Sequence, residues 1–315
     1  MRDNNFIIEN NAKHLWHPMG APGDSINNPP KVITNANGSQ ISDMDGHTTV
    51  DAVGGLWCVN LGYSNEAVKN AISEQLNHLP YYSGFAGTTN PAAIEASYMV
   101  KEMFKADGME KVFFTSGGSD SVETCLRLSR QYHRLRGEPT RTKFISLKKG
   151  YHGTHFGGAS VNGNNRFRIA YEPLLPGCFH LPSPYTYRNP FNETDPQKLA
   201  LNIAQTFEDE IAFQDKNTIA AFIMEPIQGA GGVIVPDPSF MGLMQEICER
   251  NGILMISDEV ITGFGRTGSW SGARHWNVKP DMMSMAKGIT SGYFPVGAAL
   301  MGEKVADVFE NSNSP

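Results

Sequence analysis

Two residues whose types suit covalent chemistry lie within one stretch of the chain, residues 253–288. The stretch opens with the apolar run ILMIS, which breaks at Asp258 and Glu259, and a second apolar run, MMSMA, leads to Lys287. A strand that is apolar on both faces is typical of a buried parallel sheet. Acids at the carboxyl end of such a strand lie where open α/β sheets bind ligands, and we expect the lysine to arrive at the same edge.

An ammonium beside a carboxylate at a sheet edge is the minimum geometry for a pyridoxal phosphate site. In such a site the lysine forms a Schiff base with the aldehyde, and the acid holds the pyridine nitrogen protonated. Lys287 and Asp258 are therefore the candidate catalytic residues. The alternative is an acid at a strand end and a solvated lysine before a glycine turn, because motif matches carry false positives.

A turn rich in glycine and serine is the second candidate for chemistry. The segment KVFFTSGGSDSVETCLRLSRQY reads as a short strand, a turn and a helix. The free backbone N–H groups and the positive dipole end of such a helix form an anion site. Gly118 and Ser119 are our candidates for binding a phosphate. The alternative is that Ser119 or Asp120 simply caps the helix N-terminus, because the same sequence also satisfies the pattern of a helix cap.

Two further loops carry candidate residues. In the loop around Tyr151 and His152, a ring beside glycines can lie flat on a planar cofactor. His152 and His155 also form an HxxH pair, but no third ligand lies near, so we expect no metal. Glu225 breaks the buried strand IAAFIM and is expected at the same sheet edge as Asp258.

The elements that position these residues alternate between strand and helix. Five apolar runs read as strands, namely KVFF, KFISL, IAAFIM, ILMISDEVI and MMSMA, and helical periodicity separates most of them. This pattern predicts an α/β fold with a mostly parallel sheet covered by helices on both faces. Residues 1–50 read as an N-terminal arm with a hairpin that turns at Asn37 and Gly38. Residues 161–200 read as irregular.

Composition excludes several classes of protein. The chain has 315 residues, of which 40% are hydrophobic and 18% charged, and its formal net charge of -6 argues against a nucleic-acid surface. The four cysteines are scattered, as expected of reduced thiols. The N-terminus lacks the pattern of a signal peptide, and the apolar runs are too short for a membrane span. We therefore expect a soluble cytoplasmic protein without nucleic-acid or membrane partners.

The segment GFGRTG, residues 263–268, matches the glycine spacing of a dinucleotide fingerprint. The segment SWSGARHWN follows it in place of a helix, and no acid ends a second strand about twenty residues further on. The match therefore gives little support to a nicotinamide-dependent oxidoreductase.

Taken together, the ordered motifs resemble the class III aminotransferases, which are pyridoxal phosphate enzymes of the aspartate aminotransferase superfamily. The likeness is strongest to ω-amino acid–pyruvate and amine–pyruvate transaminases. It covers nearly the whole chain through the motifs LWHPM, DAVGGLWCVNLGY, LPYYSGFAGTTNP, SGGSDSVET, GYHGTHFGGAS, EPIQGAGGVIVP, DEVITGFGRTG and PDMMSMAKGITSGYFPVGAALM.

This resemblance implies a role for each matched residue. Lys287 would be the Schiff-base lysine and Asp258 the partner of the pyridine nitrogen. Val260 and Tyr151 would pack on opposite faces of the ring. Gly118 and Ser119 would hold the phosphate, and Glu225 would support the hydrogen-bond network at the ring edge. The substrate pocket would be lined by Trp57, Phe85 and Tyr151. Of these, Phe85 is one that the partner subunit of a dimer can supply.

The resemblance also implies the fold and the domains. The fold would be that of the pyridoxal phosphate-dependent transferases, with a seven-stranded type of sheet and an incomplete small domain. Residues 1–50 would belong to the small domain and residues 51–315 to the large cofactor-binding domain. The family continues through a threonine that reaches the phosphate of the partner subunit and an arginine for the substrate carboxylate. Neither has a counterpart here, so we expect a C-terminally truncated chain that forms a homodimer when full length.

The implied activity is a ping-pong transfer of an amino group from an ω-amino acid or primary amine, for example β-alanine, to pyruvate. Taurine–pyruvate and diamine–pyruvate transamination use the same motifs. Aminomutase and decarboxylase chemistry on the same cofactor are further alternatives, because the pocket decides which substrate bond breaks. A further alternative is a binding protein that has the fold but no catalytic activity, although the presence of both Lys287 and Asp258 argues against it.

Overall fold

The computed structural model describes residues 3–85 and 87–312. The chain divides between Glu74 and Gln75 into two compact units, and each is described by itself. The helix α4 (Glu66–His78) contains the boundary. The domains expected from sequence, residues 1–50 and 51–315, stay a prediction.

The N-terminal unit is built around a three-stranded antiparallel sheet in the order β1-β2-β3. Its first two strands form the expected hairpin, in which Asn37 pairs with Gln40. Gly38 lies in the turn with a φ of 57°, a left-handed conformation that glycine adopts without steric cost. The hairpin prediction is therefore confirmed. The elements of this unit before α4 are α1 (Asn4–Asn10), α2 (Pro22–Asn27), β1 (Ile33–Asn37), β2 (Gln40–Asp43), β3 (Thr48–Val50) and the kinked turn α3 (Gly54–Trp57).

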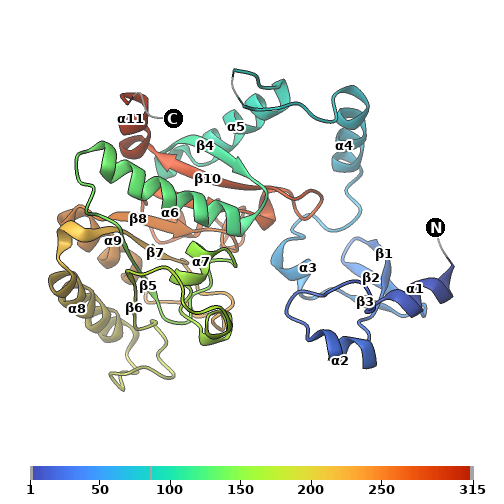
Figure 1. Ribbon diagram of the computed structural model, residues 1–315, viewed down its shortest axis with the longest axis horizontal. Helices are drawn as coiled ribbons and strands as arrows, with labels where there is room; N and C mark the ends of the chain where they lie inside the picture. The colour runs from blue at the N-terminus through green and yellow to red at the C-terminus, as the bar shows by residue number, and fades with distance from the viewer. Residues whose placement is uncertain (1–2, 86, 313–315) are drawn as a thin grey trace. The chain divides into compact units, whose positions relative to one another are not determined.

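The C-terminal unit alternates strands and helices along the chain, as the sequence predicts (Figure 1). Its strands are β4 (Met109–Thr115), β5 (Lys143–Leu147), β6 (Cys178–Leu181), β7 (Ile219–Met224), β8 (Leu254–Asp258), β9 (Met282–Met285) and β10 (Gly297–Gly302). Its α-helices are α5 (Pro91–Met103), α6 (Gly118–Leu135), α7 (Phe156–Val161), α8 (Pro196–Gln214), α9 (Phe240–Asn251), α10 (Gly272–His275) and α11 (Glu303–Glu310). Short 3-10 turns are η1 (Lys105–Asp107), η2 (Asn165–Phe167), η3 (Ile169–Tyr171), η4 (Lys216–Thr218) and η5 (Lys287–Ile289).

Seven strands form one sheet in the order β4-β10-β9-β8-β7-β5-β6. The pairs from β9 through β6 are parallel, and β10 is antiparallel to both of its neighbours. Parallel strands need crossover connections, which the helices supply. The predicted α/β class with a mostly parallel sheet is therefore confirmed.

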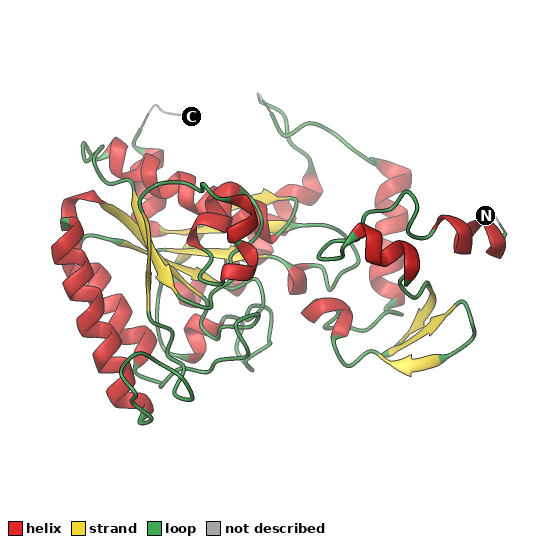
Figure 2. Cartoon of the chain, turned by 60° about the horizontal axis from the view of Figure 1, so that its bottom comes forward, coloured by secondary structure: helices red, strands yellow, loops and turns green. Residues whose placement is uncertain are grey.

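Helices cover both faces of this sheet (Figures 1 and 2). Along β8, Met255 belongs to a buried cluster that includes residues of α8 and α9, whereas Ile256 belongs to a second cluster that includes residues of α6. Successive residues of a strand point to opposite faces, so both faces of β8 are buried. This burial explains the continuous apolar run that precedes Asp258.

The sequence pattern of α6 matches its packing. Val122, Cys125, Leu126 and Ser129 are all buried, and their spacing places them on one stripe of the helix. The stripe lies against the sheet, while the first turn of the helix begins directly after β4. Packing of this stripe therefore fixes the position of the helix N-terminus at the sheet edge.

Two strands of the C-terminal unit were not expected from the sequence. β6 lies within residues 161–200, which we predicted to be irregular, so that prediction is wrong for Cys178–Leu181. Parallel pairing with β5 gives this short segment a partner that its proline-rich surroundings do not reveal. β10 has the sequence GAALMG, and its small residues give no strand signal although it pairs on both sides.

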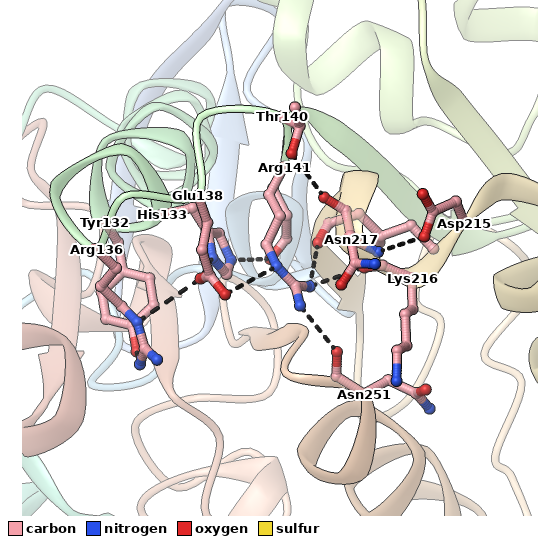
Figure 3. A network of polar contacts seen from close by, with 12 residues as sticks. Tyr132, His133, Arg136, Glu138, Thr140, Arg141, Asp215, Lys216, Asn217 and Asn251 are labelled. Atoms are coloured by element: carbon pink, nitrogen blue, oxygen red, sulfur yellow. Dashed lines mark hydrogen bonds and ion pairs between the residues drawn. The ribbon is translucent and has the colours of Figure 1, made fainter.

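A polar network joins the amino-terminal ends of the strands (Figure 3). The buried guanidinium of Arg141 donates to the backbone oxygens of Lys216, Ile219 and Asn251 at 2.9–3.2 Å. Glu138 Oε1 lies 3.7 Å from its Nε atom. One side chain therefore ties the starts of β7 and β8 to the loop before β5, at the opposite strand ends from Asp258.

Among the helices of the described residues, none has the length and apolar character required to cross a membrane.

Candidate active site

A cavity of about 420 Å³ lies at the carboxyl ends of the central strands of the C-terminal unit. Its walls come from the turn between β4 and α6, the loop after β5, the ends of β7 and β8, and the segment between β9 and β10. Every residue that the sequence assigns to the cofactor lines this cavity: Gly118, Ser119, Tyr151, Glu225, Asp258, Val260 and Lys287. The structure therefore brings these residues together, as expected where parallel strands end.

Asp258 is the last residue of β8, and its carboxylate is almost fully buried. Its Oδ1 atom accepts hydrogen bonds from Ser284 Oγ at 3.0 Å and from the backbone N–H of Val260 at 3.1 Å. Ser284 is the register partner of Asp258 on β9, which places its hydroxyl beside the carboxylate. Oδ2 lies 2.7 Å from Nδ1 of His152. These contacts fix the orientation of the carboxylate.

His152 also lines this cavity, although the resemblance gave it no role. The sequence offered its ring as one that can lie flat on a cofactor and as part of an HxxH pair, whereas the ring is buried and contacts Asp258. Its backbone N–H donates to Asn162 Oδ1 at 2.5 Å, which holds the loop in place. Nε2 is buried and has no hydrogen-bond partner among the described residues. The signal that could have found it is its place in the same glycine-rich loop as Tyr151.

Glu225 follows the last residue of β7 and joins three segments of the wall. Its Oε1 accepts from the backbone N–H of Tyr151 at 3.0 Å, and its Oε2 accepts from that of Gly229 at 2.8 Å. Burial away from water raises the pKa of Glu225 to about 7. Near neutral pH this carboxyl can therefore either donate or accept a hydrogen bond at the cavity wall.

The amino-terminal end of α6 forms the wall on the β4 side. A Cβ atom on Gly118 would lie 3.1 Å from Val260 Cγ1, so the close approach of the helix to the loop after β8 favours glycine. The hydroxyl of Ser119 accepts from the backbone N–H of Thr154 at 3.1 Å. A helix of this length that begins at a cavity offers backbone N–H groups and a positive dipole end to an anion.

Tyr151, Val260 and Lys287 complete the arrangement. The ring of Tyr151 packs on that of Phe167 with centroids 4.6 Å apart and an interplanar angle of 60°. Burial, together with the charge of Asp258, raises the pKa of the Tyr151 hydroxyl. Lys287 begins η5 with a φ of 47°, a left-handed conformation that is uncommon for a side chain of this size and concentrates at functional sites.

Two predicted substrate-pocket residues are not placed in this cavity. Phe85 is 85% exposed, and the described residues that line the cavity do not include it. Trp57 belongs to the N-terminal unit, which is described by itself. Their roles, and those of the cofactor residues above, stay predictions.

The residues present fit pyridoxal phosphate. A buried, hydrogen-bonded carboxylate suits a protonated pyridine nitrogen, a helix N-terminus suits a phosphate, and an amine at the same cavity suits an aldehyde. The side chains of Val260 and Tyr151 supply an apolar and an aromatic surface for a flat ring.

The sequence profile of the family described as Aminotransferase class-III matches residues 23–314. The chain therefore belongs to the class-III aminotransferases. It is 38% identical over 278 residues to a putrescine–pyruvate aminotransferase of Pseudomonas aeruginosa, with 88% of this chain and 60% of that protein covered. It is 34% identical to an omega-aminotransferase of Caulobacter vibrioides, with 97% and 69% covered. This chain thus spans between three-fifths and seven-tenths of the length of these two relatives.

Solved structures give the same family. An amine transaminase from an uncultivated Pseudomonas species, solved in its PLP-bound (internal aldimine) form, has a TM-score of 0.93 and 46% identity, with 96% of this chain and 68% of that chain covered. An (S)-enantioselective omega-transaminase from Thermomicrobium roseum has a TM-score of 0.95 and 33% identity, with 100% and 69% covered. The fold is therefore that of the pyridoxal phosphate-dependent transaminases, as the resemblance implied.

Proposed function

We propose that this protein is a pyridoxal phosphate-dependent transaminase that moves an amino group from an ω-amino acid or primary amine to pyruvate by a ping-pong mechanism. The observation that carries the proposal is the shared cavity of Lys287 and Asp258, in which a buried carboxylate is already oriented by His152 and Ser284. Membership of the class-III aminotransferases supports the same conclusion.

Each wall of the cavity has a task in this proposal. Asp258 holds a proton on the pyridine nitrogen, and the N-terminus of α6 at Gly118 and Ser119 binds the phosphate. Val260 and Tyr151 hold the ring between them. Glu225 supports the hydrogen bonds at the ring edge through a carboxyl that titrates near neutral pH. When bound, the cofactor supplies an aldehyde that reacts with amines and a ring that accepts electrons from the substrate carbon.

Lys287 has two tasks. Its amine would hold the cofactor through the aldehyde that the cofactor supplies. Its Nζ atom would also serve as general base and acid, taking a proton from the substrate carbon and giving it back. Pyruvate would accept the amino group in the same cavity.

The names of the relatives support the choice of substrates. The Pseudomonas aeruginosa relative is named for putrescine and pyruvate, which favours a diamine donor as the second candidate beside β-alanine and other ω-amino acids. Both candidates share pyruvate as the acceptor.

The proposed homodimer is supported by large apolar side chains exposed on α5, Ile94 and Tyr98, and by the exposed ring of Phe85. A cytoplasmic location remains part of the proposal and rests on the scattered cysteines.

An amine-donor panel with pyruvate, scored by alanine formation, tests the activity. We expect alanine from at least one terminal amine, and visible absorbance of the protein after incubation with pyridoxal phosphate. Lys287→Ala should abolish the covalent cofactor absorbance and the alanine signal, and Lys279→Ala, a change to a lysine outside the cavity lining, should preserve both. Wild-type turnover and absorbance in the Lys287→Ala variant would refute the assignment.

A further inference from the structure

The carboxylate of Glu259 is fully buried directly beside Asp258 and is not among the residues that line the cavity. Its Oε1 atom accepts hydrogen bonds from Ser257 Oγ and from the backbone N–H of Ala273, both at 2.8 Å. Its Oε2 atom accepts from Thr262 Oγ1 at 2.5 Å and from the backbone N–H of Gly272 at 2.7 Å. Four donors therefore surround one side chain.

These donors flank one loop, residues 260–271, on both sides. Ser257 lies on β8 before the loop and Thr262 near its start, and the two backbone N–H groups belong to the first turn of α10, directly after its end. One carboxylate thus closes the loop onto the strand from which it leaves. Closing a loop in this way lowers the number of conformations open to the residues within it.

The closed loop carries part of the cavity wall. Val260 and Ile261 line the cavity, and Val260 lies against the start of α6 at Gly118. The backbone N–H of Glu259 donates to the backbone oxygen of Ser284 at 2.9 Å, and the hydroxyl of the same serine donates to Asp258. Glu259 is therefore joined to the cavity wall at Val260 and to the strand that orients Asp258.

The far end of the loop is itself anchored. Ser271 Oγ accepts from the backbone N–H of Arg274 at 2.9 Å and donates to Asp107 Oδ1 at 2.6 Å. The guanidinium of Arg274 forms an ion pair with the same buried acid. A Cβ atom on Gly272 would lie 2.7 Å from Pro226 Cβ, so α10 packs tightly where Glu259 reaches it. Packing and hydrogen bonds therefore hold the first turn of α10 in place where it donates to Glu259.

We propose that Glu259 is a positioning residue that holds Val260 against the cofactor ring and keeps Asp258 aligned with the pyridine nitrogen. The inference rests on the proposed function, because it names what the carboxylate positions. A glutamine at this place would present an amide N–H to donors that are themselves N–H or O–H groups, so at least one of the four hydrogen bonds is replaced by repulsion.

The test compares Glu259→Gln with the wild type and with Glu138→Gln. Glu138 lies in the Arg141 network at the opposite strand ends and therefore controls for a general loss of stability (Figure 3). We expect Glu259→Gln to weaken binding of pyridoxal phosphate about tenfold, the lower end of the effect that losing the hydrogen-bond partner of a ligating residue has in metal sites, and to shift the visible absorbance maximum of the bound form. Glu138→Gln should leave both unchanged.

A milder variant keeps the test informative when Glu259→Gln does not fold. Thr262→Val preserves the shape of a buried side chain and removes one donor to Glu259, so a smaller shift in the same direction is expected. Wild-type affinity and absorbance in a folded Glu259→Gln, or in Thr262→Val, would overturn the positioning role. Failure of the wild type to bind pyridoxal phosphate would instead contradict the proposed function.

Discussion

The Nδ1 atom of His152 lies 2.7 Å from Oδ2 of Asp258, in a contact that is buried on both sides. The two residues come from the loop after β5 and from the end of β8, and the sheet order places these strands on either side of β7. A buried carboxylate without donors is costly, and a hydrogen bond from an imidazole N–H lowers that cost. His152 therefore satisfies and orients the buried carboxylate of Asp258.

Removing this support should weaken the binding of pyridoxal phosphate. We expect His152→Phe to raise the dissociation constant about tenfold, equivalent to about 1.4 kcal/mol, because the buried Asp258 carboxylate loses a donor that fixes its orientation. His152→Gln, which keeps an N–H donor, should recover part of the affinity. Absorbance titration with the cofactor measures both.

A matched control is available in His133. Its ring is also buried, and its Nε2 atom lies 2.9 Å from the backbone oxygen of Ala220, but the residue does not line the cavity. His133→Phe should lower the melting temperature without changing the affinity for the cofactor. Equal affinities in His152→Phe and the wild type would show that Asp258 does not depend on the histidine.

The pH dependence of stability should report Glu225. Its pKa is raised to about 7 in the folded protein from 4.5, so the folded state binds a proton that the unfolded chain has released between these values. The free energy of unfolding therefore falls as the pH rises from about 4.5 to about 7, by up to about 3 kcal/mol from this group. Below about pH 4.5 the group is protonated in both states and contributes no slope.

Glu225→Gln should remove this slope, because the amide does not titrate. Urea unfolding at a series of pH values between 4 and 8 measures it. The comparison concerns the slope and not the absolute stability, since an amide cannot accept from both Tyr151 and Gly229 as the carboxylate does. An unchanged slope in the variant would assign the pH dependence to other groups.

The close approach of α6 to the loop after β8 gives another prediction. In Gly118→Ala the new methyl group would lie 3.1 Å from Val260 Cγ1, so the side chain of Val260 must shift by a few tenths of an ångström from its place at the cavity wall. We expect weaker cofactor binding by a factor of about ten or more, since small displacements in a positioned site are costly. Gly242→Ala is the control. It lies in α9 with no atom within 4 Å of the new Cβ, so stability should rise by up to about 1 kcal/mol with unchanged affinity.

Much of this site could be predicted from the sequence because the ends of buried strands can be recognised where a polar residue follows an apolar run. Asp258 and Glu225 break apolar runs, and the rule that parallel strands end at one edge is enough to bring them together. The contact between His152 and Asp258 could not be found in this way, since it depends on a loop conformation fixed by Asn162. The role of Trp57 stays a prediction because this residue belongs to the N-terminal unit, which is described by itself.

The fold shows the same limit. β8 was predicted because burial on both faces leaves a continuous apolar run, whereas β10 was missed because glycine and alanine at its packed positions carry no strand preference. The four hydrogen bonds of Glu259 could not be predicted from the sequence either, because two of the donors are backbone N–H groups of α10. Every residue except proline has a backbone N–H group, so the residue types do not show which one donates to Glu259.

The network around Arg141 should matter for stability and not for chemistry (Figure 3). Replacing Arg141 by methionine leaves three backbone oxygens without their donor at the starts of β7 and β8, and we expect a loss of about 3 kcal/mol in the free energy of unfolding. Arg136→Met, at a half-exposed side chain that donates to the Tyr132 hydroxyl, should cost about 0.5 kcal/mol or less. Urea unfolding measures both, and cofactor affinity at a temperature where each variant is folded should equal that of the wild type. A change in affinity for Arg141→Met alone would mean that the two ends of the strands are coupled.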